Sequence, residues 1–211
     1  MTTSSQIDPV LGADERRLLH WLGEQKAARI DQLEAVLECD GQRALRTVAG
    51  MCEAGLAEIS ELLVGEPAWV FATRRGLRLA GSGFKLWRGR PWMLAHVGEI
   101  NEVRLHIQRM APESEWICER KLWRERQRGE HLPDGVVVTD GRRVAIEVEL
   151  HLKSRAQTTA IVDELTSRFD AVVYFCARQT YWRLLRYRLS GQWPTLQVRG
   201  LPSEAAQEDR R

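Results

Sequence analysis

Residues 171–177 read Ala-Val-Val-Tyr-Phe-Cys-Ala, a continuously apolar run. The run is far shorter than the roughly 18 apolar residues that a membrane-spanning helix needs. A short run of this kind is typical of a strand covered on both faces, as strands are in a sheet packed between helices. Apolar residues at helical spacing occur on either side of it, over 155–169 and over 181–189. We therefore expect an α/β domain built around this strand.

The same patterns extend this domain over residues 92–200. A helix is expected over 94–110, and Asp140-Gly141 is a tight-turn signal between two predicted strands, 132–138 and 143–150. The buried face of the first helix is predicted to be Val97, Ile100, Val103, Ile107 and Met110. The other predicted elements are a strand at 116–120, an exposed loop at 124–130, helices at 155–169 and 181–189, and a last strand at 196–199. The order α-β-β-β-α-β-α-β predicts a mixed sheet.

The first third of the chain has a different organisation, which we place at residues 10–84. Helices are expected over 14–23, 30–37 and 42–54, and the third is predicted to follow Asp40 and to end at Gly55. A hairpin pattern comes next, with strands over 56–63 and 69–73 around a turn at 64–68, and then a short helix over 73–79. Helix, short helix, helix and hairpin in this order predict a winged helix-turn-helix.

The third helix of this domain would lie in the major groove of double-stranded DNA, whose width admits a helix. Its inward positions are predicted to be Leu45, Val48 and Cys52. The residues predicted to face the DNA are Gln42, Arg43, Arg46 and Thr47. Wing and linker cations that would hold phosphates are Arg74, Arg75, Lys85, Arg88 and Arg90. The alternative is a winged helix that binds protein, with Arg43 and Arg46 merely solvated.

Composition excludes several other classes. The 211 residues are 44% apolar and 28% charged, as in a globular chain, and the formal net charge is only +2, so DNA contacts must come from local patches. The four cysteines have no C-x-x-C spacing, which argues against a zinc site. With neither a signal-peptide pattern nor a membrane span, a cytoplasmic protein is expected. Residues 1–9 and 201–211 are expected to be flexible termini.

Three carboxylates belong to the two strands joined by the tight turn. Asp134 follows Pro133 at the start of the first strand, and Glu147 and Glu149 alternate with apolar residues on the second, so that both point to one side. Neighbouring strands would let Asp134 and Glu147 share a divalent cation, with Glu149 assisting. Oxygen ligands favour magnesium or manganese, which would activate water for attack on a phosphodiester. Alternatively, these residues form an ordinary sheet face exposed to solvent. The histidines that flank the strands, His131 and His151, are interpreted as surface residues, with contact to substrate as the alternative.

Pro133-Asp134 followed by Glu147 and Glu149 resembles the PD-(D/E)xK nuclease superfamily. The α-β-β-β-α-β order of the predicted domain also resembles the core of that restriction-endonuclease-like fold. The resemblance implies a metal-dependent nuclease site in which Asp134 and Glu147 hold the metal. The usual lysine position is occupied by Glu149, whereas Lys153 lies four residues later, near the junction of strand and helix. Either Lys153 is a relocated catalytic lysine, or the site is degenerate.

A closer resemblance covers most of the chain. A winged helix followed by His96…Asn101, Glu119, Pro133-Asp134-Gly135 and Glu147-Val148-Glu149-Leu150 is similar to the replication-relaxation family. Proteins of that family are encoded largely on plasmids and integrated mobile elements. The resemblance implies a role in plasmid replication, DNA relaxation or mobilisation.

The sequence leaves three functions open. The first is a mobile-element protein that cuts or nicks DNA with a divalent metal. The second is a non-enzymatic transcriptional regulator whose second domain is a catalytically inert nuclease fold. The third is an accessory subunit of a larger replication or transfer complex. A homodimer is compatible with each of them, because winged-helix proteins often bind paired half-sites.

Overall fold

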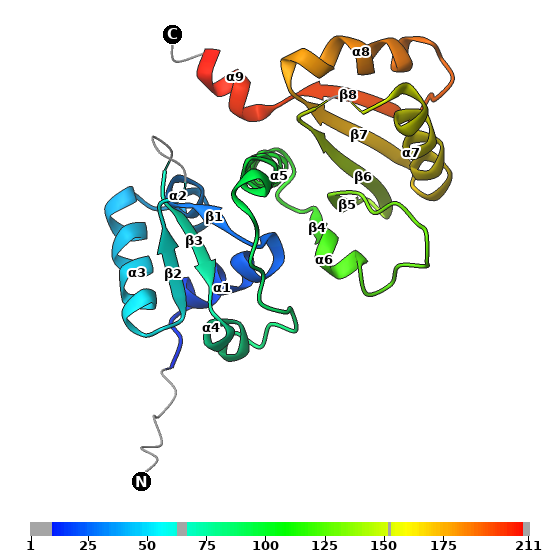
Figure 1. Ribbon diagram of the computed structural model, residues 1–211. Coiled ribbons are helices and arrows are strands. Elements are labelled where there is room, and N and C mark those ends of the chain that lie inside the picture. The colour runs from blue at the N-terminus through cyan, green and yellow to red at the C-terminus, as the bar shows by residue number, and fades with distance from the viewer. Residues whose placement is uncertain (1–9, 63–66, 152, 209–211) are drawn as a thin grey trace. The chain divides into compact units, whose positions relative to one another are not determined.

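A computed structural model describes residues 10–62, 67–151 and 153–208. Within these ranges the chain is mixed α and β, with a three-stranded sheet and a five-stranded sheet (Figure 1). The mixed α/β class expected from the sequence is confirmed. No helix of these ranges is both long enough and apolar enough to cross a membrane.

The chain divides into two compact units, Met1–Gly98 and Glu99–Arg211, and the division falls inside one helix, α5 (Pro91–Met110). The domain boundary expected from the sequence lies between residues 84 and 92, before the observed division at Gly98. The expected boundary was based on glycine and proline residues, which are typical of linkers. The start of α5 belongs to the first unit because it supplies buried side chains to that core. The cluster is formed by Ala27, Trp69, Leu94 and Val97.

The first unit combines helices with a small sheet. Its elements before α5 are α1 (Ala13–Gln25), β1 (Ala28–Arg29), α2 (Ile30–Leu37), α3 (Gly41–Glu53), β2 (Ala57–Ser60), β3 (Trp69–Ala72) and α4 (Arg74–Leu79). The strand order is β1-β3-β2, and both pairs are antiparallel. The two-residue strand β1 is too short to leave a pattern in the sequence, so it was not predicted. Of the predicted turn 64–68, residues 64–66 lie outside the described ranges.

Local signals fix both ends of α3. The Asp40 carboxylate accepts a hydrogen bond from the Arg43 amide at 2.8 Å, which caps the first turn. Gly55 has a φ of 68° after the last turn, and the Leu56 amide donates to the Met51 carbonyl at 2.8 Å. This is a Schellman-type end, which glycine accommodates because it has no Cβ.

The buried face of α3 differs from the prediction. Ala44, Val48 and Met51 are buried, whereas Leu45 is 50% exposed and Cys52 is half-buried. Both sets have helical spacing and share Val48, so periodicity alone does not choose between them. Leu45 consequently belongs to the exposed face of α3.

The second unit is built on the five-stranded sheet. Its elements after α5 are β4 (Glu115–Cys118), α6 (Glu119–Leu122), β5 (Gly135–Thr139), β6 (Arg142–Glu149), α7 (Arg155–Arg168), β7 (Ala171–Cys176), α8 (Arg178–Leu189), β8 (Leu196–Gly200) and α9 (Pro202–Glu208). The strand order is β4-β5-β6-β7-β8. The first two pairs are antiparallel and the last two are parallel, so the predicted mixed sheet is confirmed. Asp140 and Gly141 join β5 to β6 with positive φ angles of 48° and 73°, as a two-residue type I′ turn requires.

Both faces of this sheet are covered. On one face, Ala145 of β6 and Tyr174 of β7 belong to a core that includes residues of α7 and α8, such as Leu165 and Leu184. On the other face, the Phe175 ring contacts the His106 ring of α5, with 6.3 Å between the centroids. β7 is therefore buried from both sides, as its apolar sequence predicted.

Three further details depart from the prediction. Glu119 begins the short helix α6 and does not continue the strand before it. Met110 is exposed, because it is the last residue of α5. Part of the expected flexible C-terminus forms α9, where the Ser203 hydroxyl donates to the Glu99 carboxylate at 2.6 Å.

Candidate functional site

The three predicted carboxylates lie close together at the β5–β6 pair. The antiparallel register pairs Gly135 with Ile146, which places Asp134 level with Glu147. The Asp134 carboxylate accepts a hydrogen bond from the Val148 amide at 2.8 Å. Asp134 is the residue just before β5, and its side chain thus binds the backbone of β6. Its position follows from the strand pairing that the tight turn sets.

Glu147 and Glu149 are buried, with relative exposures of 3% and 8%. The interpretation of these residues as an ordinary exposed sheet face is therefore wrong. Both point to the face that α7 and α8 cover, because they share it with Ala145. Buried carboxylates need partners, since an unpaired buried charge is strongly unfavourable.

The partner of Glu147 is His131, in the loop before β5. His131 Nε2 lies 2.9 Å from Glu147 Oε1. Burial raises the pKa of the Glu147 carboxyl, the His131 hydrogen bond opposes that rise, and the charge of Asp134 adds to it. The same hydrogen bond raises the pKa of the His131 imidazole. This contact differs from the interpretation of His131 as a surface residue, because it depends on how the loop before β5 folds over β6.

The partner of Glu149 is Lys153, whose ammonium group donates to the carboxylate across four positions. Burial is the main cause that raises the pKa of Glu147, and the hydrogen bond to Glu147 is the main cause that raises the pKa of His131. The charge of Lys153 lowers both pKa values. The ammonium group is therefore near the whole cluster, although it stands outside the usual lysine position. Ser154 follows at once and caps α7, so the strand end and the helix start hold Lys153 in place.

A fifth group faces this cluster. Tyr174 of β7 is level with Glu147 in the parallel register, and neighbouring side chains of paired strands share a face. Tyr174 is 1% exposed, and its hydroxyl has no hydrogen-bond partner within the described residues. Burial raises the pKa of this phenol, and the charges of Glu147, Glu149 and Asp134 act in the same direction. Sequence reasoning missed Tyr174 because α7 separates β6 from β7 along the chain.

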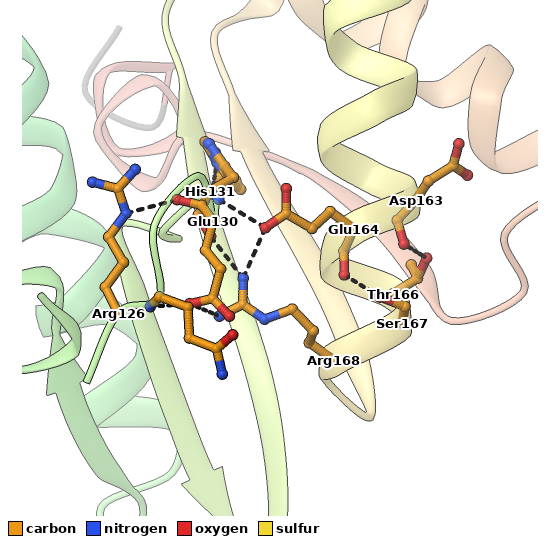
Figure 2. A network of polar contacts seen from close by, with 10 residues as sticks. Arg126, Glu130, His131, Asp163, Glu164, Thr166, Ser167 and Arg168 are labelled. Carbon is orange, nitrogen blue, oxygen red and sulfur yellow. Dashed lines mark hydrogen bonds and ion pairs between the residues drawn. The ribbon is translucent and has the colours of Figure 1, made fainter.

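The backbone of His131 is fixed from α7 (Figure 2). Glu164 Oε1 accepts from the His131 amide at 2.7 Å, and Arg168 Nη1 donates to the His131 carbonyl at 2.9 Å. Arg168 also donates to Glu164 at 2.9 Å, and it lies 3.6 Å from a carboxylate oxygen of Glu130. We call Glu164 and Arg168 the His131 clamp. The clamp orients the imidazole that contacts Glu147.

An open hollow of about 410 Å³ adjoins His131. It is lined by Glu119, Trp123, Arg126, Gly129, Glu130, His131 and Leu132. The Trp123 side chain is 57% exposed, and the Arg126 guanidinium lies 4.7 Å from its ring centroid. An exposed indole beside cations is a surface on which a nucleic-acid base can stack.

The predicted DNA-contacting residues of α3 fall into two groups. Gln42, Arg43 and Arg46 are exposed, and Thr47 is half-buried. Arg43 is engaged by Asp14 of α1 at 2.7 Å, and the Thr47 hydroxyl donates to the Arg43 carbonyl at 3.0 Å. Gln42 and Arg46 are therefore the two predicted residues most available on this helix.

The two predicted arginines after the hairpin also differ in role. Arg75 donates to the Ala54 carbonyl at 3.0 Å, so it caps the end of α3. Arg74 is exposed and lines an open groove of about 720 Å³ on the first unit. Arg78 and Lys85 line the same groove, which is therefore suited to a polyanion.

The carboxylate cluster offers oxygen donors to a metal ion. The described residues contain no group of three or more histidine, cysteine, aspartate or glutamate side chains placed to hold one. Lys153 engages Glu149, whereas His131 contacts one oxygen of Glu147 and the Val148 amide contacts one oxygen of Asp134. Magnesium is commonly bound through one or two carboxylates, with waters and substrate phosphates as its other ligands. The oxygen donors of Asp134 and Glu147 and the buried, unpartnered Tyr174 hydroxyl are compatible with a two-carboxylate site for magnesium or manganese.

Comparison with known proteins gives no identification. No family model matches the chain, and no curated protein matches it. Among solved structures, the chain is similar to one described as "PigF with SAH", with a TM-score of 0.24 and 13% sequence identity. The similarity covers 89% of this chain and 56% of that one, so this chain spans just over half the length of that structure. A likeness at this level carries no argument about fold or function.

Proposed function

We propose that this chain is a DNA-binding protein whose first unit is a winged helix-turn-helix. The order of three helices and a β-hairpin supports the proposal, together with the exposed face of α3. That face has helical spacing and combines an amide, a cation and apolar groups suited to base edges and thymine methyls. It consists of Gln42, Leu45, Arg46 and Ala49. The cation-lined groove beside α4 would hold the phosphate backbone.

The second unit is proposed to be a PD-(D/E)xK-like domain that cleaves or nicks double-stranded DNA with magnesium or manganese. The position of Lys153 carries this proposal. Glu149 occupies the usual lysine position of the motif. The ammonium group of Lys153, four residues later in the chain, contacts Glu149 and so supplies a positive charge near that position. A site with two shared carboxylates and one lysine has the charges that phosphodiester hydrolysis requires.

Each residue then has a defined task. Asp134 and Glu147 would hold the cation, which supplies Lewis-acid stabilisation of the phosphodiester and activation of water. His131 keeps the buried Glu147 carboxylate in one orientation. Lys153 holds Glu149 and places a positive charge beside the phosphate that approaches the site. The hollow lined by Trp123 and Arg126 offers the DNA strand a stacking surface next to these groups.

The resemblance to the replication-relaxation family gives this function a context. We place the protein on a plasmid or other mobile element, with a role in replication, DNA relaxation or mobilisation. A homodimer would present two α3 helices to paired half-sites. Partners within a replication or transfer complex fit the same setting.

Plasmid cleavage by the purified full chain tests the enzymatic proposal. Supercoiled plasmid is expected to be lost in magnesium or manganese with the wild type, and to survive with Asp134→Asn and with Lys153→Ala. Asp140→Asn is the matched control, because it removes a carboxylate in the β5–β6 turn, where asparagine tolerates the positive φ. Equal cleavage by Asp134→Asn and by the wild type would overturn the proposal.

A second candidate function is a non-enzymatic transcriptional regulator or accessory subunit with an inert nuclease-like fold. The His131–Glu147 contact favours it, because this buried carboxylate already has a partner. This candidate predicts tight duplex binding that is the same with and without manganese, and intact plasmid under every condition.

A further inference from the structure

Among the fully buried polar side-chain atoms of the described residues that lack a hydrogen-bond partner, the Tyr174 hydroxyl is the one that belongs to the carboxylate cluster. Tyr174 is level with Glu147 on the adjacent strand, and the next position on the same face pairs Cys176 with Glu149. A phenylalanine would fill the same space without an unmet polar group. The hydroxyl thus carries a cost for the fold that packing does not explain.

The surroundings restrict what can meet this hydroxyl. The side chain is 1% exposed, so bulk solvent does not reach it freely. The charged groups that act on the phenol are the carboxylates of Asp134, Glu147 and Glu149. Lys153 contacts Glu149 and His131 contacts Glu147, so these two groups offset part of that negative charge. A negatively charged ligand would be repelled by the three carboxylates, whereas a hydrated cation would be attracted. A water molecule bound to a cation is also a strong hydrogen-bond donor, and a phenol oxygen can accept from it.

We infer that Tyr174 is a further ligand-binding residue of this site, whose hydroxyl accepts a hydrogen bond from a water molecule on the divalent cation held by Asp134 and Glu147. The inference rests on the proposed function for the cation itself and gives Tyr174 a role that the proposed function does not assign to it. Outer contacts of this kind orient the waters of a bound ion, and their loss typically weakens metal binding about 10–100-fold.

Manganese alone is the probe, and it is titrated into the purified full chain while free manganese is followed by electron paramagnetic resonance. Tyr174→Phe is compared with the wild type and with Tyr187→Phe. Tyr187 is a matched control because it packs against the same core cluster, with its ring centroid 5.7 Å from that of Trp193. The melting temperature of each metal-free protein is measured in parallel.

We expect Tyr174→Phe to bind manganese about tenfold more weakly, while its metal-free melting temperature is equal to or higher than that of the wild type. Tyr187→Phe should bind manganese as the wild type does. Unchanged manganese affinity in Tyr174→Phe would overturn the inference and leave the cation site standing. A lower metal-free melting temperature with unchanged affinity would show that the hydroxyl serves only the fold. A wild type that binds no manganese would overturn the cation site and this inference together.

Discussion

The Nε2 atom of His131 lies 2.9 Å from the Oε1 atom of Glu147, and this contact joins a loop to the middle of the sheet. Glu147 is buried, so removing His131 leaves a carboxylate without its partner. We expect His131→Ala to lower the free energy of unfolding by about 1–3 kcal/mol, as for other buried groups left unsatisfied. Urea denaturation measures the change. The double variant with Glu147→Ala should lose less than the sum of the single variants, and strict additivity would contradict the contact.

The His131 clamp should control the mobility of the loop before β5. Glu164→Ala removes the acceptor of the His131 amide, and we expect faster hydrogen exchange across residues 126–131. Arg155→Ala, at the opposite end of α7, is the control because its side chain is exposed. Hydrogen-exchange mass spectrometry separates the two variants. Equal protection of the loop in Glu164→Ala and in the wild type would show that α7 does not hold His131.

Two glycines should respond in opposite directions to the same substitution. A Cβ at Gly50 of α3 would meet no atom within 4 Å, so Gly50→Ala is expected to stabilise the protein by about 0.5–1 kcal/mol. A Cβ at Gly76 of α4 would lie 2.1 Å from the Leu56 carbonyl oxygen, so Gly76→Ala should destabilise it by about 1–3 kcal/mol. Thermal denaturation reads both changes, and a loss of stability in Gly50→Ala would contradict the open surroundings of α3.

The arginines of the first unit should separate DNA contact from structural support. Arg46→Ala is expected to weaken binding to a duplex selected from a random pool by about 1–3 kcal/mol, with an unchanged melting temperature. Arg75→Ala should instead lower the melting temperature, because it removes the cap on the Ala54 carbonyl. Fluorescence anisotropy and thermal denaturation are measured on both variants. An unchanged DNA affinity in Arg46→Ala would show that α3 is not the recognition helix.

Local patterns predicted the elements better than they predicted the site. The Asp140-Gly141 turn and the alternation around Glu147 indicated a hairpin with two glutamates on one side, and both features are present. The burial of those glutamates depends on α7 and α8, which lie later in the chain. The position of Tyr174 depends on the parallel pairing of β6 with β7, which no local pattern specifies.

Contacts between side chains of different helices and strands could not be predicted from the sequence either. The spacing of Lys153 from Glu149 left both a relocated lysine and a degenerate site open, and the contact between the two side chains is compatible with either. The contacts of Arg43 with Asp14 and of Arg75 with Ala54 depend on how α3 packs against α1 and α4, so the sequence assigned both arginines to DNA. A charged residue on a predicted surface is compatible with both roles until its neighbours are known.

Protonation of His106 should contribute to the loss of stability at acidic pH. Burial lowers the pKa of this imidazole, and the charge of Arg109 acts in the same direction. The unfolded chain therefore takes up a proton at a higher pH than the folded chain, so this contribution to stability is complete above about pH 6.5 and is lost as the pH falls below it. Urea denaturation between pH 7.5 and 5 should show a smaller loss for His106→Gln than for the wild type. The raised pKa of His131 has the opposite effect, because its protonation stabilises the folded chain as the pH falls. An equal loss of stability in His106→Gln and in the wild type would assign the acid sensitivity to groups other than His106.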